Sequence, residues 1–181
     1  MPWVIGIVVV VLILVIISTY NSLVSLRNRV RDQWAQIDVQ LKRRFDLIPN
    51  LIETVKGYTK HESETLENIV KVRNTYASAN TPQEAMEADG ELNKAVSRLF
   101  ALAESYPDLK ANTNFLQMQD ELKETENKIA SARQFYNDVV LRYNNKIQMF
   151  PSNIVAGLFG FKTEAFFEAN KEEKENVKVK F

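Results

Sequence analysis

The sequence predicts an all-α protein, in which an N-terminal transmembrane helix continues into a long antiparallel helical bundle of three main helices and a short C-terminal helix. Three observations support this fold class. The chain begins with an uncharged apolar run, the rest repeats its apolar residues at spacings of three and four, and Gly and Pro occur only 5 times each in 181 residues. So few turn-forming residues favour helices over hairpins.

The composition also narrows the possible functions. The 23 Lys and Arg residues balance 23 Asp and Glu residues, so we expect no nucleic-acid partner. Cysteine is absent and histidine occurs once, which excludes disulfides, thiol catalysis and Cys/His zinc sites. No nucleophile and base pair can be assigned, so we expect a protein that is not an enzyme and has no cofactor and no metal site.

The first element is the apolar run WVIGIVVVVLILVII at residues 3–17, which predicts a membrane anchor over residues 1–22. Extended to Tyr20, a helix of this length spans roughly 26 Å, close to the hydrocarbon thickness of a bilayer. Trp3 and Tyr20 mark its two ends, where aromatic rings prefer the headgroup level, and Val10 and Ile17 lie between them. A cleaved signal peptide is the alternative, but the run lacks a basic segment before it and a small-residue cleavage site after it.

The distribution of basic residues predicts the orientation of the anchor. Arg27, Arg29 and Arg31 follow the apolar run, and no charged residue precedes it. Because basic residues are retained on the cytoplasmic side, we expect the N-terminus outside and the C-terminal body in the cytoplasm. The reverse orientation is the alternative, since the charge bias is small.

The body, residues 23–167, begins with a long helix. Its apolar stripe contains pairs eleven residues apart, which support a nearly straight packing seam. Pro49 predicts a kink rather than an end, and helical spacing continues to Tyr76. The pairs are Val30 with Leu41, Leu41 with Ile52, Trp34 with Phe45, and Ile37 with Ile48.

Two further helices are predicted by their boundary residues. Thr81, Pro82 and Glu84 form a helix start, and Pro107 ends that helix. A third helix begins after Asn112, repeats aromatic and aliphatic residues at intervals of seven, and ends before Pro151. Short connections favour an up-down-up bundle; in the alternative, the third helix returns towards the membrane. The heptad positions are Phe115, Leu122, Ile129, Tyr136, Tyr143 and Phe150.

A short apolar segment follows Pro151 and precedes a polar tail at residues 168–181. We expect this segment to dock on its own bundle or on an adjacent one and to set a homo-oligomer, because it cannot form a core by itself. Gly157 and Gly160 are expected to permit close backbone approach, and the absence of Lys and Arg argues against binding to the membrane surface. The candidate contacts are Ile154, Val155, Leu158, Phe159 and Phe161.

His61 is the only imidazole and the one candidate phosphoacceptor. It stands in KHESETL, loosely similar to the phosphoacceptor box of sensor kinases, but Leu66 replaces the proline and no ATP-binding domain follows. The alternative, a solvated helix face, is favoured. Carboxylates at 62, 64 and 67 or at 121, 124 and 126 are likewise interpreted as solvated faces, rather than as a divalent-ion or acid–base site.

Five sequence blocks together resemble the bacterial LemA family. They are residues 20–24, 34–44, 46–51, 106–112 and 150–154, in family order, and the similarity covers nearly the whole chain. The resemblance implies a single-pass protein of the inner membrane with its N-terminus outside and a cytoplasmic helical bundle. The family has no established enzymatic activity, and its magnetosome-associated relatives suggest a role in membrane organisation. No functional residue can be carried over from it.

The sequence therefore leads us to expect a membrane-anchored helical scaffold or adaptor that organises proteins at the bacterial cytoplasmic membrane. The expected partners are the lipid bilayer, further copies of this chain and an unidentified membrane or cytoplasmic protein. A signalling module that uses His61, and an enzyme or metal protein that uses exposed carboxylates, are the two alternatives.

Overall fold

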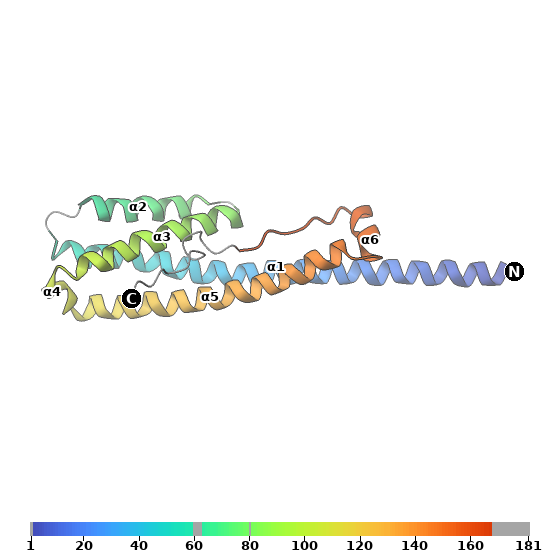
Figure 1. The fold of residues 1–181 in the computed structure, drawn as a ribbon, viewed down its shortest axis with the longest axis horizontal. Coiled ribbons are helices and arrows are strands. Elements are labelled where there is room, and N and C mark those ends of the chain that lie inside the picture. The colour runs from blue at the N-terminus through green and yellow to red at the C-terminus, as the bar shows by residue number, and fades with distance from the viewer. Residues whose placement is uncertain (1, 60–62, 80, 168–181) are drawn as a thin grey trace, which may run out of the picture. The chain divides into compact units, whose positions relative to one another are not determined.

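The computed structural model describes residues 2–59, 63–79 and 81–167, and every regular element in these ranges is a helix (Figure 1). The all-α class is thereby confirmed. In chain order the helices are α1 (Pro2–Lys56), α2 (Ser63–Ala77), α3 (Pro82–Ala103), α4 (Pro107–Lys110), α5 (Thr113–Gln148) and α6 (Ser152–Leu158).

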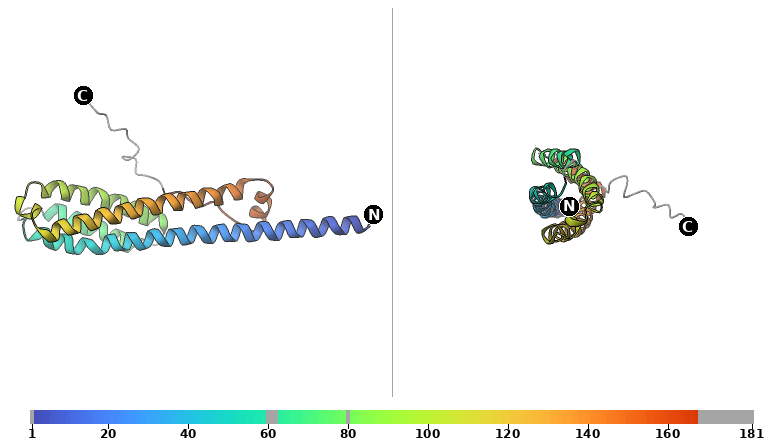
Figure 2. Two further views of the ribbon diagram at one scale, coloured as in Figure 1. Left: turned by 90° about the horizontal axis from the view of Figure 1, so that it is seen from below. Right: turned by 90° about the vertical axis from the view of Figure 1, so that its left-hand side faces the viewer.

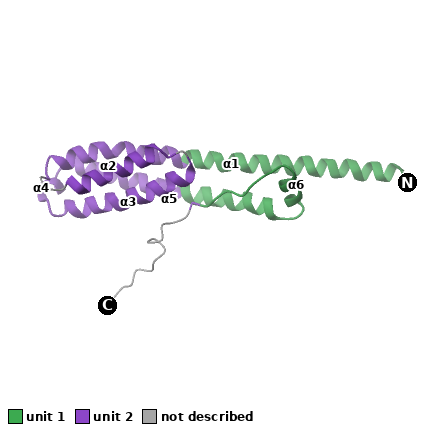
Figure 3. Cartoon of the chain, turned by 90° about the horizontal axis from the view of Figure 1, so that it is seen from above, with its two compact units in different colours: residues 1–36, 132–166 green, residues 37–131, 167–181 purple. Residues whose placement is uncertain are grey.

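The chain forms two compact units, and each unit combines segments that lie far apart in the sequence (Figure 3). Unit 1 consists of Met1–Gln36 and Ala132–Phe166, and unit 2 of Ile37–Ser131 and Phe167–Phe181. Helices α1 and α5 therefore contribute to both units. The expected anchor, body and tail boundaries stay predictions, and the tail at residues 168–181 lies outside the described residues.

The N-terminal part of α1 exposes its apolar side chains on all sides. An 18-residue window of this helix is long and apolar enough to cross a membrane, and none of it is buried within the chain. Leu23 is the first fully buried side chain along α1. The helix thus changes, between Tyr20 and Leu23, from a surface suited to hydrocarbon to one that is apolar on a single stripe.

Within unit 1, α5 runs antiparallel to α1 (Figure 2). The Trp34 and Tyr136 ring centroids lie 6.0 Å apart, whereas Phe159, further along the chain, has its ring centroid 4.8 Å from that of Tyr20, earlier on α1. The C-terminal end of α5 and the segment after it therefore return to the end of the apolar run. This is the alternative arrangement of the sequence analysis, in which the third helix returns towards the membrane.

Unit 2 has a core to which five helices contribute. In the same unit, both partners of the eleven-residue pairs Leu41–Ile52 and Ile37–Ile48 are buried. The predicted heptad of α5 is buried through Tyr143. Phe150, the next position, is 80% exposed because α5 has already ended at Gln148.

The first body helix is shorter than the sequence predicted, because α1 ends at Lys56 and α2 is a separate helix. The amides of Tyr58 and Thr59 both donate to the carbonyl of Val55, which closes α1 in a turn at Gly57. Glycine is a poor helix former, and ending α1 here lets α2 place its stripe on the same core as α1. That stripe is Leu66, Ile69 and Val72.

The predicted start of α3 is confirmed. The Glu84 amide donates to Thr81 Oγ1 at 3.2 Å and the Thr81 amide donates to Glu84 Oε2 at 3.3 Å, which completes a capping box. Asn112 likewise caps α5, because its Oδ1 accepts a 3.0 Å hydrogen bond from the Phe115 amide.

A buried arginine joins three helices in unit 2. Arg44 on α1 donates from Nη1 to Asp89 Oδ1 on α3 at 2.8 Å, and its Nη2 donates to Asn93 Oδ1. Glu126 Oε2 on α5 lies 2.7 Å from the same Nη1, close enough for an ion pair but without hydrogen-bond geometry. The sequence analysis gave no reason to expect burial of this arginine, yet Arg44 is 3% exposed and Asp89 is fully buried.

We expect Arg44→Met to lower the free energy of unfolding by about 3–5 kcal/mol, because it removes the guanidinium charge that faces the buried Asp89 carboxylate. Arg43→Met is the matched control. Arg43 is exposed, so its loss should change stability by no more than about 0.5 kcal/mol. Denaturant unfolding of the detergent-solubilised chain, followed by helical circular dichroism, measures both.

Adding Asp89→Leu to Arg44→Met should restore much of the lost stability, because the buried charge is then removed together with its partner. Equal stability of Arg44→Met and the native chain would contradict the buried ion pair. So would a double variant no more stable than the single one.

Candidate functional site

The predicted anchor residues all lie on α1 with exposed side chains. Trp3, Val10 and Ile17 are at least half exposed, and Tyr20 is the last large apolar side chain that faces outward before the buried stripe begins. His61 lies outside the described residues. Among the described residues, no group of three His, Asp or Glu side chains is placed to hold a metal ion.

The residues that the structure brings together lie at the end of the apolar run, in unit 1. We call Tyr20, Arg27, Phe159 and Phe161 the juxtamembrane cluster. The Tyr20 ring centroid lies 4.8 Å from that of Phe159 and 5.7 Å from that of Phe161, and the Arg27 guanidinium carbon lies 5.0 Å from the Phe161 ring centroid. These are ordinary aromatic and cation–π contacts, and they fix the chain after α6 against α1.

Helix α6 is held at both ends by local hydrogen bonds. At its start, Ser152 Oγ is buried and lies 2.6 Å from the Lys146 carbonyl oxygen and 2.9 Å from that of Met149, so the hydroxyl ties α6 to the last turn of α5. At its end, Gly160 has φ +68°, and the Phe161 amide donates to the Ala156 carbonyl at 2.9 Å. This is a Schellman motif.

The two glycines of this segment therefore act differently from the sequence expectation. A Cβ at Gly157 or at Gly160 would meet no atom within 4 Å, so neither glycine serves close backbone approach. Gly160 is instead needed for its left-handed conformation, which reverses the chain after α6.

The irregular segment after α6 is fastened to α5 by side chains of the heptad face. Asn144 Nδ2 donates to the Glu164 carbonyl and Asn144 Oδ1 accepts from the Glu164 amide, both at 2.9 Å. The Tyr136 hydroxyl donates to the Ala165 carbonyl at 3.1 Å. Sequence reasoning treated Tyr136 only as an apolar seam residue and did not single out Asn144. A polar Asn beside the heptad position of Tyr143 was the available signal.

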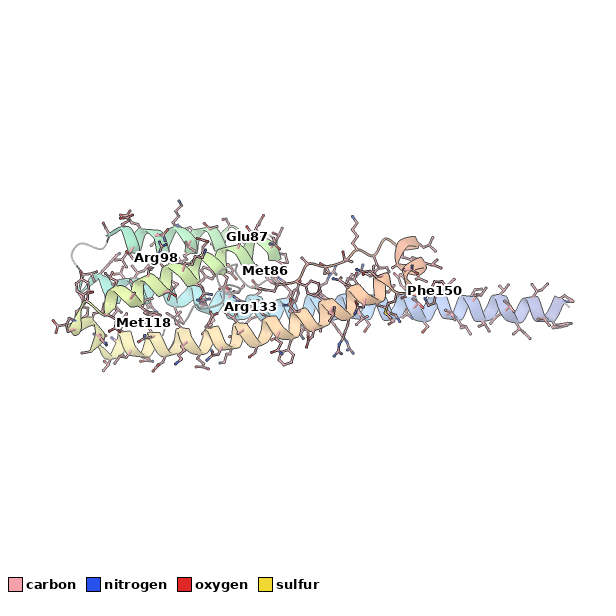
Figure 4. The ribbon with its side chains drawn as sticks, viewed as in Figure 1. Met86, Glu87, Arg98, Met118, Arg133 and Phe150 are labelled. Carbon is pink, nitrogen blue, oxygen red and sulfur yellow. The ribbon has the colours of Figure 1, made fainter. Side chains whose placement is uncertain are left out.

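The five candidate docking residues divide into two sets. Val155 and Phe161 are buried within this chain, whereas Ile154, Leu158 and Phe159 are 62%, 75% and 51% exposed. Phe150, just after the end of α5, is also exposed and is labelled in Figure 4. The oligomer contact that we expected at these residues stays a prediction.

Burial changes the acidity of two tyrosines in the α5 seam of unit 1. Desolvation, with a smaller contribution from the Glu164 carboxylate, raises the pKa of Tyr136 to about 12. The same two causes raise the pKa of Tyr143, and the positive charges of Arg27 and Arg31 partly oppose them.

The side chains that hold this part of unit 1 together are aromatic, hydroxyl and amide groups, which pack and donate hydrogen bonds. Such groups suit a structural contact surface.

The raised pKa of Tyr136 predicts a loss of stability in alkali. An unfolded tyrosine ionises near pH 10, whereas the folded one keeps its proton to about 12, so the free energy of unfolding should fall as pH rises through this window. Tyr136→Phe removes this contribution. We expect the variant to be about 1 kcal/mol less stable at neutral pH, through loss of the hydrogen bond to Ala165, and the deficit to shrink above pH ~10. Denaturant titrations at a series of pH values test this, and parallel curves for the two proteins would contradict it.

Comparison with known proteins finds relatives that align with most of this chain. The chain is 27% identical over 164 residues to Protein LemA of Metamycoplasma hominis, which covers 90% of this chain and 75% of that protein. It is 25% identical over 186 residues to Magnetosome protein MamQ 2 of Paramagnetospirillum magneticum, which covers 88% of this chain and 68% of the relative. It is 23% identical to Magnetosome protein MamQ of Magnetospirillum gryphiswaldense, with coverage of 87% and 68%.

The match to a protein family extends over most of the chain, including α1 from Gln33 onward and all of the helices that follow. Because residues 33–181 match the LemA family, the chain belongs to that family.

Proposed function

We propose that this protein is a non-enzymatic, membrane-anchored helical scaffold, which organises other proteins at the bacterial cytoplasmic membrane as a homo-oligomer. The observation that carries the proposal is the continuity of α1 in unit 1. The apolar run leads without a break into the stretch that contains Leu23, Val30 and Trp34, against which α5 packs. The helical surface formed by α1 and α5 is thereby held next to the membrane surface.

The relatives support a structural role. Their printed names, Protein LemA and Magnetosome protein MamQ, denote no enzymatic activity. The described part of unit 1 agrees, because its buried polar side chains fasten backbone segments to one another. Asn144 and Tyr136 bind the irregular segment, and Ser152 binds the end of α5.

The outer face of α5 offers a surface for contacts with other proteins. Phe135 and Leu141 are 62% and 49% exposed on this helix, in unit 1. Exposed large apolar side chains on an otherwise polar helix are typical of protein–protein contact sites. Six residues apart on one helix, these two side chains point about 120° from each other and do not form one patch. We place the self-association of the scaffold at Phe135, together with recruitment of a second protein.

Site-specific crosslinking in native membranes tests this proposal. We expect a photoactivatable amino acid at Phe135 to give discrete adducts, including one of twice the chain mass. The matched control is the same group at Gln134, an exposed polar neighbour on α5, which should give weaker adducts. Mass spectrometry of the adducts identifies the second protein.

A chain that stays monomeric in nanodiscs, with no discrete adduct from either position, would overturn the scaffold proposal. Equal adducts from Phe135 and Gln134 would show contact without preference for the apolar position, and would overturn the assignment of the surface.

The orientation proposed here places the N-terminus outside and the helical body in the cytoplasm, on the evidence of Arg27, Arg29 and Arg31 after the span. In this cysteine-free chain, Lys110→Cys places one thiol at an exposed position of α4. We expect an impermeant thiol reagent to label it only after lysis. A cysteine inserted directly after Met1 is the opposite control and should react on intact cells. The reverse pattern would show the opposite orientation.

A further inference from the structure

Five large apolar side chains are exposed together around α6, and we call them the apolar tip. Two lie in the turn after α5, two on α6 and one directly after α6, all in unit 1, and Figure 4 labels Phe150 among them. Their exposure is 51% or more, higher than that of any apolar residue of the packed seam. The members of the apolar tip are Met149, Phe150, Ile154, Leu158 and Phe159.

The outward direction of the apolar tip is fixed by the packing of its neighbours. Val155 and Ala156, on the opposite side of α6, are buried, and so is Phe161 just after it. Ser152 holds the start of α6, and the Schellman motif at Gly160 holds its end. The tip therefore cannot turn inward without breaking these contacts, and its exposed side chains need a partner outside the chain.

The position of the tip identifies that partner. Phe159 contacts the ring of Tyr20, and Tyr20 ends the apolar run of α1. An aromatic ring at the end of a membrane span lies at the headgroup level. Figure 1 shows α6 beside α1, and the contact of Phe159 with Tyr20 places the tip at the end of the expected span. Lipid surrounds a span at that level, so a second copy would have to displace lipid to reach the tip.

The charge pattern agrees with this position. No charged residue occurs from Ile147 to Phe161, while Lys146 and Lys162 stand directly on either side, and Arg27 contacts Phe161. An uncharged apolar segment between basic residues matches the boundary between acyl chains and phosphates. The lack of basic residues inside the segment argues against binding to the charged membrane surface, but insertion below the phosphates requires it.

We propose that the apolar tip inserts into the bilayer beside the span, at the boundary between headgroups and acyl chains, and forms a second membrane contact of this chain. The proposal depends on the anchor and is independent of the scaffold role. Its consequence is geometric. A single span leaves unit 1 free to rotate about the α1 axis, whereas a second contact away from that axis fixes which face of unit 1 points along the membrane.

Depth-dependent fluorescence quenching of the full chain tests the proposal. Leu158→Cys carries an environment-sensitive fluorophore, and the protein is reconstituted into vesicles of phosphatidylethanolamine and phosphatidylglycerol that contain no other protein. We expect blue-shifted emission, a several-fold greater loss to acyl-chain nitroxide than to aqueous iodide, and the opposite preference for the matched control Gln134→Cys, exposed on α5.

A second variant separates insertion from a change in folding. Phe150→Asp with Ile154→Asp, in the Leu158→Cys background, puts two charges on exposed positions of the tip. We expect quenching by the acyl-chain nitroxide to fall to the level of the control, with unchanged helical circular dichroism.

Two results would overturn the proposal. A Leu158 probe quenched by iodide and not by the nitroxide would place the tip in water. A probe shielded from both quenchers would show that a second copy covers it. Neither result depends on the crosslinks at Phe135, so the failure of this proposal is distinguishable from that of the scaffold.

Discussion

The structure depends on one constraint: the same helix has to satisfy two solvents. The side chains of residues 3–17 are exposed on every face of α1, and none of the described residues covers them. Only hydrocarbon can accept such a surface without a large cost, so the bilayer replaces a protein core for these turns. From Leu23 onward the helix is apolar on one side alone, and α5 then becomes necessary as its partner in unit 1.

In unit 2, charge rather than apolar burial restricts the arrangement of the helices. Leucine and isoleucine stripes tolerate small shifts along a helix, since one aliphatic side chain replaces another. Arg44 does not, because its guanidinium must meet Asp89 on one helix and Glu126 on another. Burying these groups costs desolvation energy, so the pair adds little net stability, but any arrangement that separates them is strongly disfavoured. The network therefore selects one alignment of α1, α3 and α5.

Sequence periodicity predicted the elements well where one physical signal decided them. The apolar run, the Thr81 capping box and the heptad through Tyr143 were each read from local spacing. The break after Lys56 was not predicted, because the apolar stripe of α2 keeps helical spacing and only Gly57 signals the turn. The burial of Arg44 was missed for a different reason. It lies three residues after Leu41, in the stripe itself, but its partner Asp89 is 45 residues away and no local pattern connects them.

The polar side chains of the α5 seam explain how the candidate site is kept in place. An irregular segment carries backbone amides and carbonyls that need partners, and residues 162–166 have no helix or sheet to supply them. Asn144 supplies a donor and an acceptor to Glu164, and Tyr136 a donor to Ala165. Since these side chains project from a helix that packs on α1, they also hold the irregular segment in a fixed position relative to α1. Two sets of contacts therefore hold the juxtamembrane cluster in place: the ring contacts at Tyr20 and the hydrogen bonds along α5. Because it is attached in both ways, a short uncharged segment can keep large apolar side chains pointed outward.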